Sequence, residues 1–465
     1  MKFWALGEWQ GGDRVIEVRN PYDGALIDTV PKASADLVRQ AIGYAHGYDF
    51  GLTAWERFEI LRKVHDGIER RTDELARTIS LESGKTLRDA HIEIRRSLQT
   101  FLFSAEEAKR ITGETVAVDA SAGMPSSLGI VIREPLGVVV AIGPFNYPLN
   151  LLAHKVGPAI AANNAVVVKP ASSTPLTALK MAELFIEAGV PPRMLQVITG
   201  DAREISDALV TDPRVRKITF TGSIPVGKAI CAKAGLQSVC MELGGNDPLI
   251  VLNDADLDKC IPVAVDGAFG NNGERCTSIK RIIIEAGIAD RFLERFAAET
   301  AKLKVGDQLD PATDVGPLID AAAAAEIEDK VSRSITAGAR LVLGNRREGA
   351  LYWPTILDNV TPDMPVVADE TFGPVAPLIR VADFEEALRV ANDTPFGLQS
   401  GIFTNDLAKA MAAARRLKAG AVKINKGPGF RAEHLPFGGV KDSGIGREGV
   451  KYAVESMTTL KTIVI

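Results

Sequence analysis

The pattern of hydrophobic and polar positions changes at about the end of the first quarter of the chain. Residues 55–111 are highly charged, and their apolar side chains recur at helical spacing. We predict one long amphipathic helix over residues 55–82 and a second over residues 86–111. From Gly129 onward, short runs rich in β-branched residues alternate with helical stretches. This alternation predicts an α/β protein with a parallel, doubly wound sheet.

Two regions of the chain show the alternation, one before Glu242 and one after it. In the first we expect strands at 137–142, 164–169, 195–199 and 217–220, with helices at 174–188 and from Gly222 to Ala234. In the second we expect strands at 247–252 and 279–284, with helices at 257–269, 288–303 and 321–337. The last residues, 461–465, form a strand that needs a neighbouring strand to pair with.

Composition narrows the class of protein. The 465 residues suffice for two or three domains, and the net charge of −5 argues against a nucleic-acid binder. The four cysteines include no C-x-x-C pair and no histidine cluster, so we expect neither a metal site nor disulfides. The most apolar stretch, 136–152, is interrupted by Pro144, Asn146 and Pro148, so we expect no membrane span. We therefore expect a soluble protein of the reducing cytoplasm without a signal peptide.

Three residues carry the candidate chemistry. Cys276 follows a segment rich in Gly and Asn that suits an exposed turn, and Arg275 directly before it is a cation that favours the thiolate. Glu242 ends an apolar run before two glycines, and Asn146 lies between two prolines. A lone cysteine is usually a packing residue, but a thiol, a carboxylate and an amide together suit aldehyde oxidation through a thioester. The thiolate attacks the carbonyl, the amide stabilises the oxyanion, and the carboxylate activates the hydrolytic water.

In order and spacing, the segments Pro144–Pro148, Met241–Asn246 and Gly270–Ser278 closely resemble those of the aldehyde dehydrogenase superfamily. The resemblance implies that Cys276 is the nucleophile and that Glu242 is the general base. It further implies that Asn146 and the Cys276 backbone N–H bind the oxyanion. Family members that pass the acyl group to coenzyme A lack the carboxylate, so hydrolysis is favoured over an acylating enzyme. Retention of the catalytic residues also argues against a non-catalytic structural relative.

The same resemblance implies a nicotinamide cofactor. The segment that closes a strand and opens a helix contains a single Gly-x-x-x-x-Gly rather than the usual dinucleotide fingerprint. Glycines there allow the backbone to approach a pyrophosphate at a helix N-terminus. The implied cofactor-binding residues are Phe145, Lys169, Ser172, Gly222, Ser223, Gly227, Glu370 and Phe372.

Ser172 bears on which nicotinamide cofactor is used. Relatives that prefer NAD often carry a glutamate at this position, where it binds both ribose hydroxyls and would repel a 2′-phosphate. Ser172 removes that repulsion. We therefore expect NADP or NAD to serve, with NADP favoured.

Four residues are candidates for binding the substrate: Arg96, His154, Arg275 and Arg431. Each alone would be a surface or structural side chain. Together they match positions at which the non-phosphorylating glyceraldehyde-3-phosphate and phosphonoacetaldehyde dehydrogenase types hold an anion. Guanidinium groups suit phosphate, phosphonate or sulfonate oxygens. The lactaldehyde dehydrogenase type is the alternative, and a semialdehyde substrate also stays open; Arg275 favours the strongly anionic aldehyde.

The resemblance also implies a domain organisation. Residues 1–117 and 134–242 would form the cofactor domain, and residues 243–450 mainly the catalytic domain. Residues 118–133 and 451–465 would form an arm that joins subunits into a homodimer or homotetramer. The partners expected are a small aldehyde and further copies of the chain, with no nucleic acid, membrane or metal.

Overall fold

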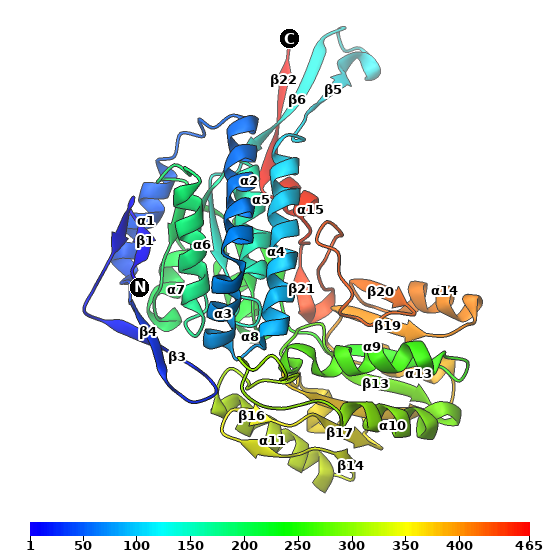
Figure 1. Cartoon of the computed structure of the whole chain (residues 1–465). Coiled ribbons are helices and arrows are strands. Elements are labelled where there is room, and N and C mark those ends of the chain that lie inside the picture. The colour runs from blue at the N-terminus through cyan, green and yellow to red at the C-terminus, as the bar shows by residue number, and fades with distance from the viewer.

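The computed structural model describes residues 1–465, and its largest sheet has eight strands in the order β2-β1-β9-β8-β7-β10-β11-β21 (Figure 1). The central strands from β9 to β11 are parallel, whereas β1, β2 and β21 pair antiparallel at the edges. The strands are β1 (Phe3–Ala5), β2 (Glu8–Gln10), β7 (Val138–Ile142), β8 (Ala165–Lys169), β9 (Leu195–Val197), β10 (Val215–Thr221), β11 (Ser238–Glu242) and β21 (Gly444–Ile445).

Helices cover this sheet, and a short hairpin of β3 (Val15–Arg19) and β4 (Leu26–Pro31) lies beside it. The helices are α1 (Ala35–His46), α2 (Ala54–Arg70), α3 (Thr72–Ser83), α4 (Leu87–Ala108), α5 (Asn150–Ala161), α6 (Pro175–Glu187), α7 (Ala202–Val210), α8 (Ile224–Lys233) and α15 (Val450–Ser456). The single helix expected over 55–82 is two helices, which is a correction. The backbone of Arg71 leaves the helical region, and its guanidinium binds Glu74 at 2.7 Å and Glu183 at 2.8 Å.

The second sheet has seven strands in the order β14-β17-β18-β13-β12-β19-β20, all parallel except β14. Its strands are β12 (Asp247–Val251), β13 (Ile279–Glu285), β14 (Arg340–Leu343), β17 (Thr355–Asp358), β18 (Val375–Val381), β19 (Gln399–Phe403) and β20 (Ala421–Ile424). A small hairpin pairs β15 (Arg347–Glu348) with β16 (Leu351–Tyr352). The helices are α9 (Leu257–Phe269), α10 (Ala286–Thr300), α11 (Ala321–Thr336), α12 (Pro365–Ala368), α13 (Phe384–Asn392) and α14 (Leu407–Arg416).

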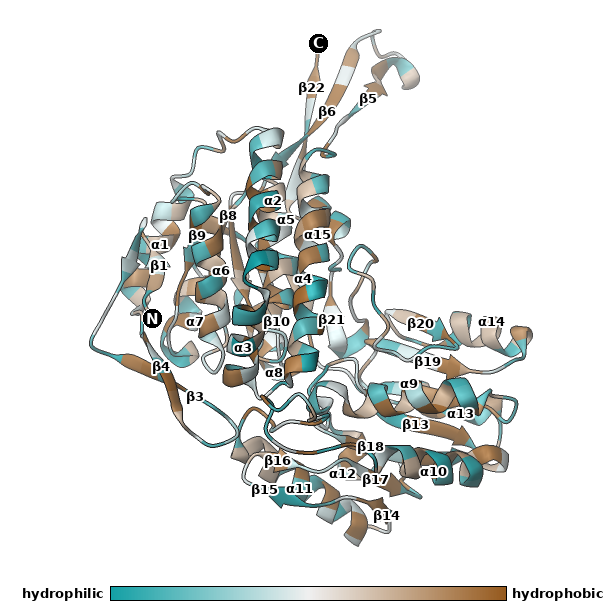
Figure 2. Ribbon diagram, in the orientation of Figure 1, coloured by the Kyte–Doolittle hydropathy of each residue, from teal (hydrophilic) through white to brown (hydrophobic).

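Both faces of the second sheet are buried. Ile250 of β12 belongs to one apolar cluster, whereas its neighbours Leu249 and Val251 belong to another on the opposite face. Strands β13 and β17 are accordingly coloured as hydrophobic in Figure 2. Parallel sheets covered on both faces are the mark of doubly wound folds, so the predicted fold class is confirmed.

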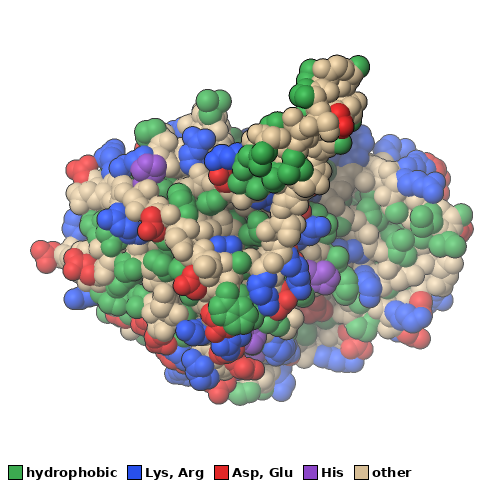
Figure 3. Space-filling view, turned by 90° about the horizontal axis from the view of Figure 1, so that it is seen from above, with side chains coloured by type: hydrophobic (Ala, Val, Ile, Leu, Met, Phe, Trp, Pro, Cys, Tyr) green, Lys and Arg blue, Asp and Glu red, His purple; other side chains and the backbone are tan.

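A three-stranded sheet of β5 (Glu114–Ala117), β6 (Leu128–Pro135) and β22 (Thr458–Val464) projects from the body of the molecule (Figure 1). The C-terminal strand β22 pairs antiparallel with β6, which gives its backbone N–H and C=O groups the partners that a lone strand lacks. Between β5 and β6, residues Val118–Ala120 form a turn of 3₁₀ helix. Hydrophobic side chains stand exposed on the arm, among them Leu460 at 58% and Val464 at 61% (Figure 3). The chain contains no helix whose length and apolar character would let it cross a membrane.

Candidate active site

The three candidate catalytic residues line one cleft of about 730 Å³. Asn146 follows β7, and Glu242 is the last residue of β11, so both lie at the carboxyl edge of the parallel strands. Cys276 comes from the second region of the chain, after the 3₁₀ helix η2 (Gly270–Gly273). Tertiary structure thus brings an amide, a carboxylate and a thiol into one cavity.

The turn before Cys276 is buried rather than exposed, which corrects the expectation. Asn271, Asn272 and Gly273 all have positive φ, of 53°, 56° and 71°. The Asn272 amide donates to the carbonyls of Gly84 and Pro317 at 3.1 and 2.8 Å, which fixes the turn. Only glycine fits at position 273, because a Cβ there would lie 2.2 Å from the backbone of Gly373.

Asn146 is held against this turn. Its side-chain amide donates to the carbonyl oxygen of Glu274 at 2.8 Å, and the Asn271 amide donates to the same oxygen at 3.2 Å. A primary amide has two N–H donors, so Asn146 keeps one for a substrate oxygen. The Glu274 side chain faces away and accepts from the Ile319 backbone at 3.0 Å, and burial raises its pKa to about 8.

The resting thiol is protonated. Burial raises the pKa of Cys276 to about 12, and the charges of Asp247, Glu370 and Glu242 act in the same direction. Only Arg431 acts to lower it among the principal contributions. The expectation that Arg275 supplies this cation was therefore wrong.

Arg275 turns away from the thiol toward the end of α9. Its guanidinium donates to the carbonyl oxygens of Asp266 and Gly267, the latter at 3.1 Å, and lies 3.7 Å from the Asp266 carboxylate. Cations are favoured at helix C-termini, where carbonyls lack intrahelical partners. Its Nε is buried and has no hydrogen-bond partner.

Glu242 is buried, and neither of its carboxylate oxygens has a hydrogen-bond partner. Burial raises its pKa well above the ordinary value, and the nearby charge of Glu448 adds to this effect. Lys155 and Arg431 oppose the shift. A carboxylate with a raised pKa can accept a proton from water, which suits a general base.

The rest of the cleft fits a dinucleotide. Its lining includes seven of the eight expected cofactor residues: Phe145, Lys169, Ser172, Gly222, Ser223, Glu370 and Phe372. The Lys169 ammonium donates to the Pro170 carbonyl at 3.1 Å, and burial lowers its pKa to about 8. The Ser172 hydroxyl donates to the Gly200 carbonyl at 3.2 Å, while Ser223 begins α8 with its hydroxyl free of a capping bond.

Gly227 is not among the residues that line this cleft. A Cβ at Gly227 would lie 2.5 Å from the Leu243 side chain, and one at Gly222 would lie 2.4 Å from the Phe220 ring. Gly227 therefore lets α8 pack closely on Leu243, and Gly222 lets the chain turn closely over Phe220.

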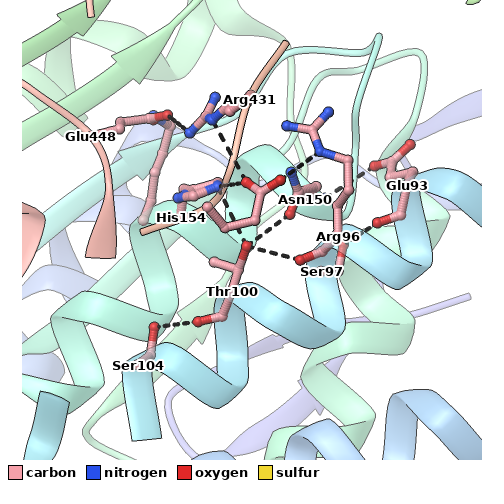
Figure 4. A network of polar contacts seen from close by, with 11 residues as sticks. Glu93, Arg96, Ser97, Thr100, Ser104, Asn150, His154, Arg431 and Glu448 are labelled. Carbon is pink, nitrogen blue, oxygen red and sulfur yellow. Dashed lines mark hydrogen bonds and ion pairs between the residues drawn. The ribbon is translucent and has the colours of Figure 1, made fainter. Parts of the chain in front are cut away.

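Three of the four expected substrate residues meet around a carboxylate that the sequence analysis missed, Glu433. Arg96 on α4 donates through Nε to Glu433 at 2.6 Å, and His154 on α5 lies 2.6 Å from the other carboxylate oxygen. Arg431 Nε is 3.6 Å from that second oxygen. Figure 4 shows Arg96, His154 and Arg431 converging from three segments that are far apart in the sequence.

A second buried carboxylate, Glu448, lies behind Arg431. It accepts from Arg431 Nη2 at 3.2 Å and from Lys155 at 2.8 Å. The Arg431 guanidinium also stacks on the Phe437 ring, 3.9 Å from its centre. Burial would raise the pKa of Glu448, but Lys155 and Arg431 hold it at about 2. No periodicity or motif marked Glu433 or Glu448, because their role depends on partners hundreds of residues away.

Arg96 and Arg275 both lie near enough to Tyr147 to act on its hydroxyl. The Arg96 guanidinium lies 5.4 Å from the centre of the Tyr147 ring. Burial raises the pKa of Tyr147 to about 12, against the charges of Arg275 and Arg96, which lower it. The Arg275 guanidinium itself is paired at the end of α9 and not with Glu433.

Comparisons with known proteins agree with this arrangement. The model of the aldehyde dehydrogenase family matches residues 9–463. The chain is 42% identical over 460 residues to 3-sulfolactaldehyde dehydrogenase of Priestia megaterium, covering 99% of this chain and 96% of that protein. It is 40% identical over 466 residues to lactaldehyde dehydrogenase of Methanocaldococcus jannaschii, covering 99% of each.

Among solved structures, an NADP-dependent glyceraldehyde-3-phosphate dehydrogenase of Bacillus halodurans complexed with NADP superimposes with a TM-score of 0.98. The two chains are 39% identical, and the match covers 100% of this chain and 98% of the Bacillus chain. The expected superfamily, fold, enzyme class and nicotinamide cofactor are thus confirmed. The chain belongs to the aldehyde dehydrogenase family and is an NAD(P)-dependent aldehyde dehydrogenase.

Proposed function

We propose that this enzyme oxidises a small aldehyde with an anionic head group to the carboxylic acid, preferably with NADP. One observation carries the proposal: Arg96 and Arg431 meet around Glu433, and Arg431 is near enough to Cys276 to lower the pKa of its thiol. Arg275 precedes Cys276 in the chain, but its guanidinium is held at the end of α9.

Each catalytic residue has a defined task in this proposal. The Cys276 thiol gives its proton to water in the cleft, and the thiolate attacks the aldehyde carbon, while Asn146 and the Cys276 backbone N–H donate to the developing oxyanion. NAD(P) accepts the hydride when bound. Glu242 then takes a proton from water, which attacks the thioester on Cys276 and releases the acid.

The relatives support an anionic substrate without deciding it. One is named for a sulfonate aldehyde, another for a phosphate aldehyde, and a third for the uncharged lactaldehyde. Lactaldehyde is therefore the second candidate substrate. Ser172 in the cleft and the NADP complex of the Bacillus enzyme favour NADP.

The proposal can be tested with Arg96→Gln and two aldehydes of the same backbone, 3-sulfolactaldehyde and lactaldehyde. A charge-assisted hydrogen bond to a buried anion is worth about 1.5–3 kcal/mol, so kcat/KM for the sulfonate should fall roughly 10- to 100-fold. Lactaldehyde has no anion to leave unpaired and should lose far less. Arg96 is a cleaner choice than Arg431, because Arg431 also acts on the thiol pKa.

Arg295→Gln is a matched control, since Arg295 binds only the exposed Asp258. It should leave both substrates unaffected. An equal loss for both aldehydes in Arg96→Gln would mean that this arginine is structural, and lactaldehyde would become the leading substrate.

We also propose that the arm joins subunits into a homodimer or homotetramer in the cytoplasm. Its exposed apolar residues, including Leu128 and Ile465, support this. The free cysteines support a reducing compartment. Light scattering of the protein and of a Leu460→Glu, Val464→Glu variant would test the assembly, because two buried charges should dissociate it.

A further inference from the structure

In both Arg96 and Arg431, the Nε atom and the terminal Nη atoms of the guanidinium group face different groups. Their Nε atoms face the buried Glu433 carboxylate, at 2.6 and 3.6 Å. In Figure 4 the terminal nitrogens of both guanidinium groups lie on one common side of the network. No hydrogen bond occupies the Nη atoms of Arg96, and Arg431 uses only Nη2, toward Glu448. An outer row of donors is thus left for a ligand.

We propose that Glu433 sets the charge of the head group accepted here, so that the site selects a monoanion over a dianion. The inference rests on the proposed function, because it concerns the same anionic substrate. Glu433 would act as a built-in counter-ion and positioning residue: it aligns the two arginines through Nε and cancels part of their charge.

The charges of the cluster support a monoanion. Arg96, Arg431 and Lys155 are its cations, and the buried carboxylates of Glu433 and Glu448 oppose them. Among these five residues, three cations stand against two carboxylates, which leaves one net positive charge within the cluster. Two neighbouring cations have carboxylate partners of their own, Glu93 for Lys85 and Asp266 for Arg275.

His154 adds no further charge. It is fully buried, and burial together with the charge of Arg431 lowers its pKa against the pull of Glu433. A neutral imidazole can donate from Nε2 to Glu433, which leaves Nδ1 as the atom without a partner, as observed. Thr100 lies 3.3 Å from the same Nε2 and helps to fix the ring.

The chemistry of the head groups then decides the preference. A sulfonate or carboxylate brings one negative charge, which the cluster balances. A phosphate ester carries about −1.5 to −2 at neutral pH, so the excess negative charge would be desolvated near Glu433 without a counter-charge. Binding of the phosphate is therefore penalised, although its oxygens match the same donors.

Three aldehydes that differ only in the substituent at C3 test the inference: 3-sulfolactaldehyde, glyceraldehyde 3-phosphate and lactaldehyde. In the wild type we expect kcat/KM for the sulfonate to exceed that for the phosphate by about 10-fold. In Glu433→Gln, which keeps the shape and removes the charge, this ratio should shift about 10-fold toward the phosphate. Glu433→Asp keeps the charge and should keep the ratio, even where its absolute rates fall.

The outcomes separate the two proposals. A wild type that prefers the phosphate overturns the inference without any variant. An equal fall for all three aldehydes in Glu433→Gln also overturns it and makes Glu433 merely structural, while the proposed function stands. A wild type that prefers lactaldehyde to both anionic aldehydes overturns the proposed function itself.

Discussion

The cofactor cleft and the charged cluster around Glu433 are built in different ways. The cleft is formed by the ends of adjacent parallel strands, and its residues lie in short contiguous motifs such as 169–172 and 220–223. The cluster joins α4, α5 and a segment near the C-terminus, so that Arg96 and Glu433 are 337 residues apart. Its side chains are buried charges that depend on one another, whereas the cleft is lined in part by apolar side chains such as Ile142, Phe220 and Leu243.

This difference teaches where sequence motifs suffice. At the carboxyl edge of a parallel sheet, topology alone brings the loops together, so a local motif predicts a site residue. In the charged cluster, the meaning of each arginine depends on its counter-ion. The carboxylates Glu433 and Glu448 offset part of the positive charge of Arg96 and Arg431 and fix the orientation of their guanidinium groups.

The largest effect is expected from Cys276→Ala, which should abolish catalysis and leave the cofactor cleft able to bind NADP. Without the nucleophile, dehydrogenase activity should fall by at least about 10⁴-fold. Binding of NADP, measured by fluorescence titration, should stay within a few-fold of wild type, because the cleft is otherwise intact. Cys231→Ala, at the other partly exposed cysteine, is the control and should stay active. Substantial turnover by Cys276→Ala would refute the mechanism.

Glu242→Gln should slow deacylation by on the order of 10²-fold or more, because the water loses its base. Rapid mixing should show a burst of reduced cofactor near one per active site, followed by a slow phase, provided that the base is not needed for acylation. A steady-state rate equal to that of the wild type would contradict the assignment of Glu242.

The same residue predicts a pH dependence. Burial and Glu448 raise the pKa of Glu242, so its basic form is populated only above that raised value. Deacylation in the wild type should therefore increase with pH through this pKa and level off above it. Glu242→Gln should lose this rise in single-turnover hydrolysis of the acyl-enzyme; a variant that retained it would show that another group titrates.

Ser172→Glu should have the smallest effect on catalysis, because it changes only the far end of the cofactor cleft. A carboxylate beside the 2′-phosphate should weaken NADP by roughly 10-fold or more while NAD changes little. The measurement is the dissociation constant of each cofactor. Equal changes for both would mean that Ser172 does not face the phosphate.

Most elements of the fold were predictable from the sequence. The β-branched runs at 138–142 and 165–169 are strands because their side chains, apart from Lys169, are apolar on both faces and the sheet is covered on both sides. The break at Arg71 was not predictable, because it depends on Glu183 of α6. The buried turn before Cys276 was missed for the same reason: Asn272 is held by carbonyls from distant segments.

The sequence by itself determined the family, the fold class and the identities of thiol, carboxylate and amide, because these are carried by local motifs and hydrophobic periodicity. Only the tertiary structure decided the electrostatics. Burial makes Cys276 a protonated thiol at rest and leaves Glu242 without a polar partner. The tertiary structure also pairs Arg96 with Glu433, so that this arginine is not a free cation. Coulomb interactions in a desolvated site depend on distance and burial, and both are set by contacts between segments far apart in the chain.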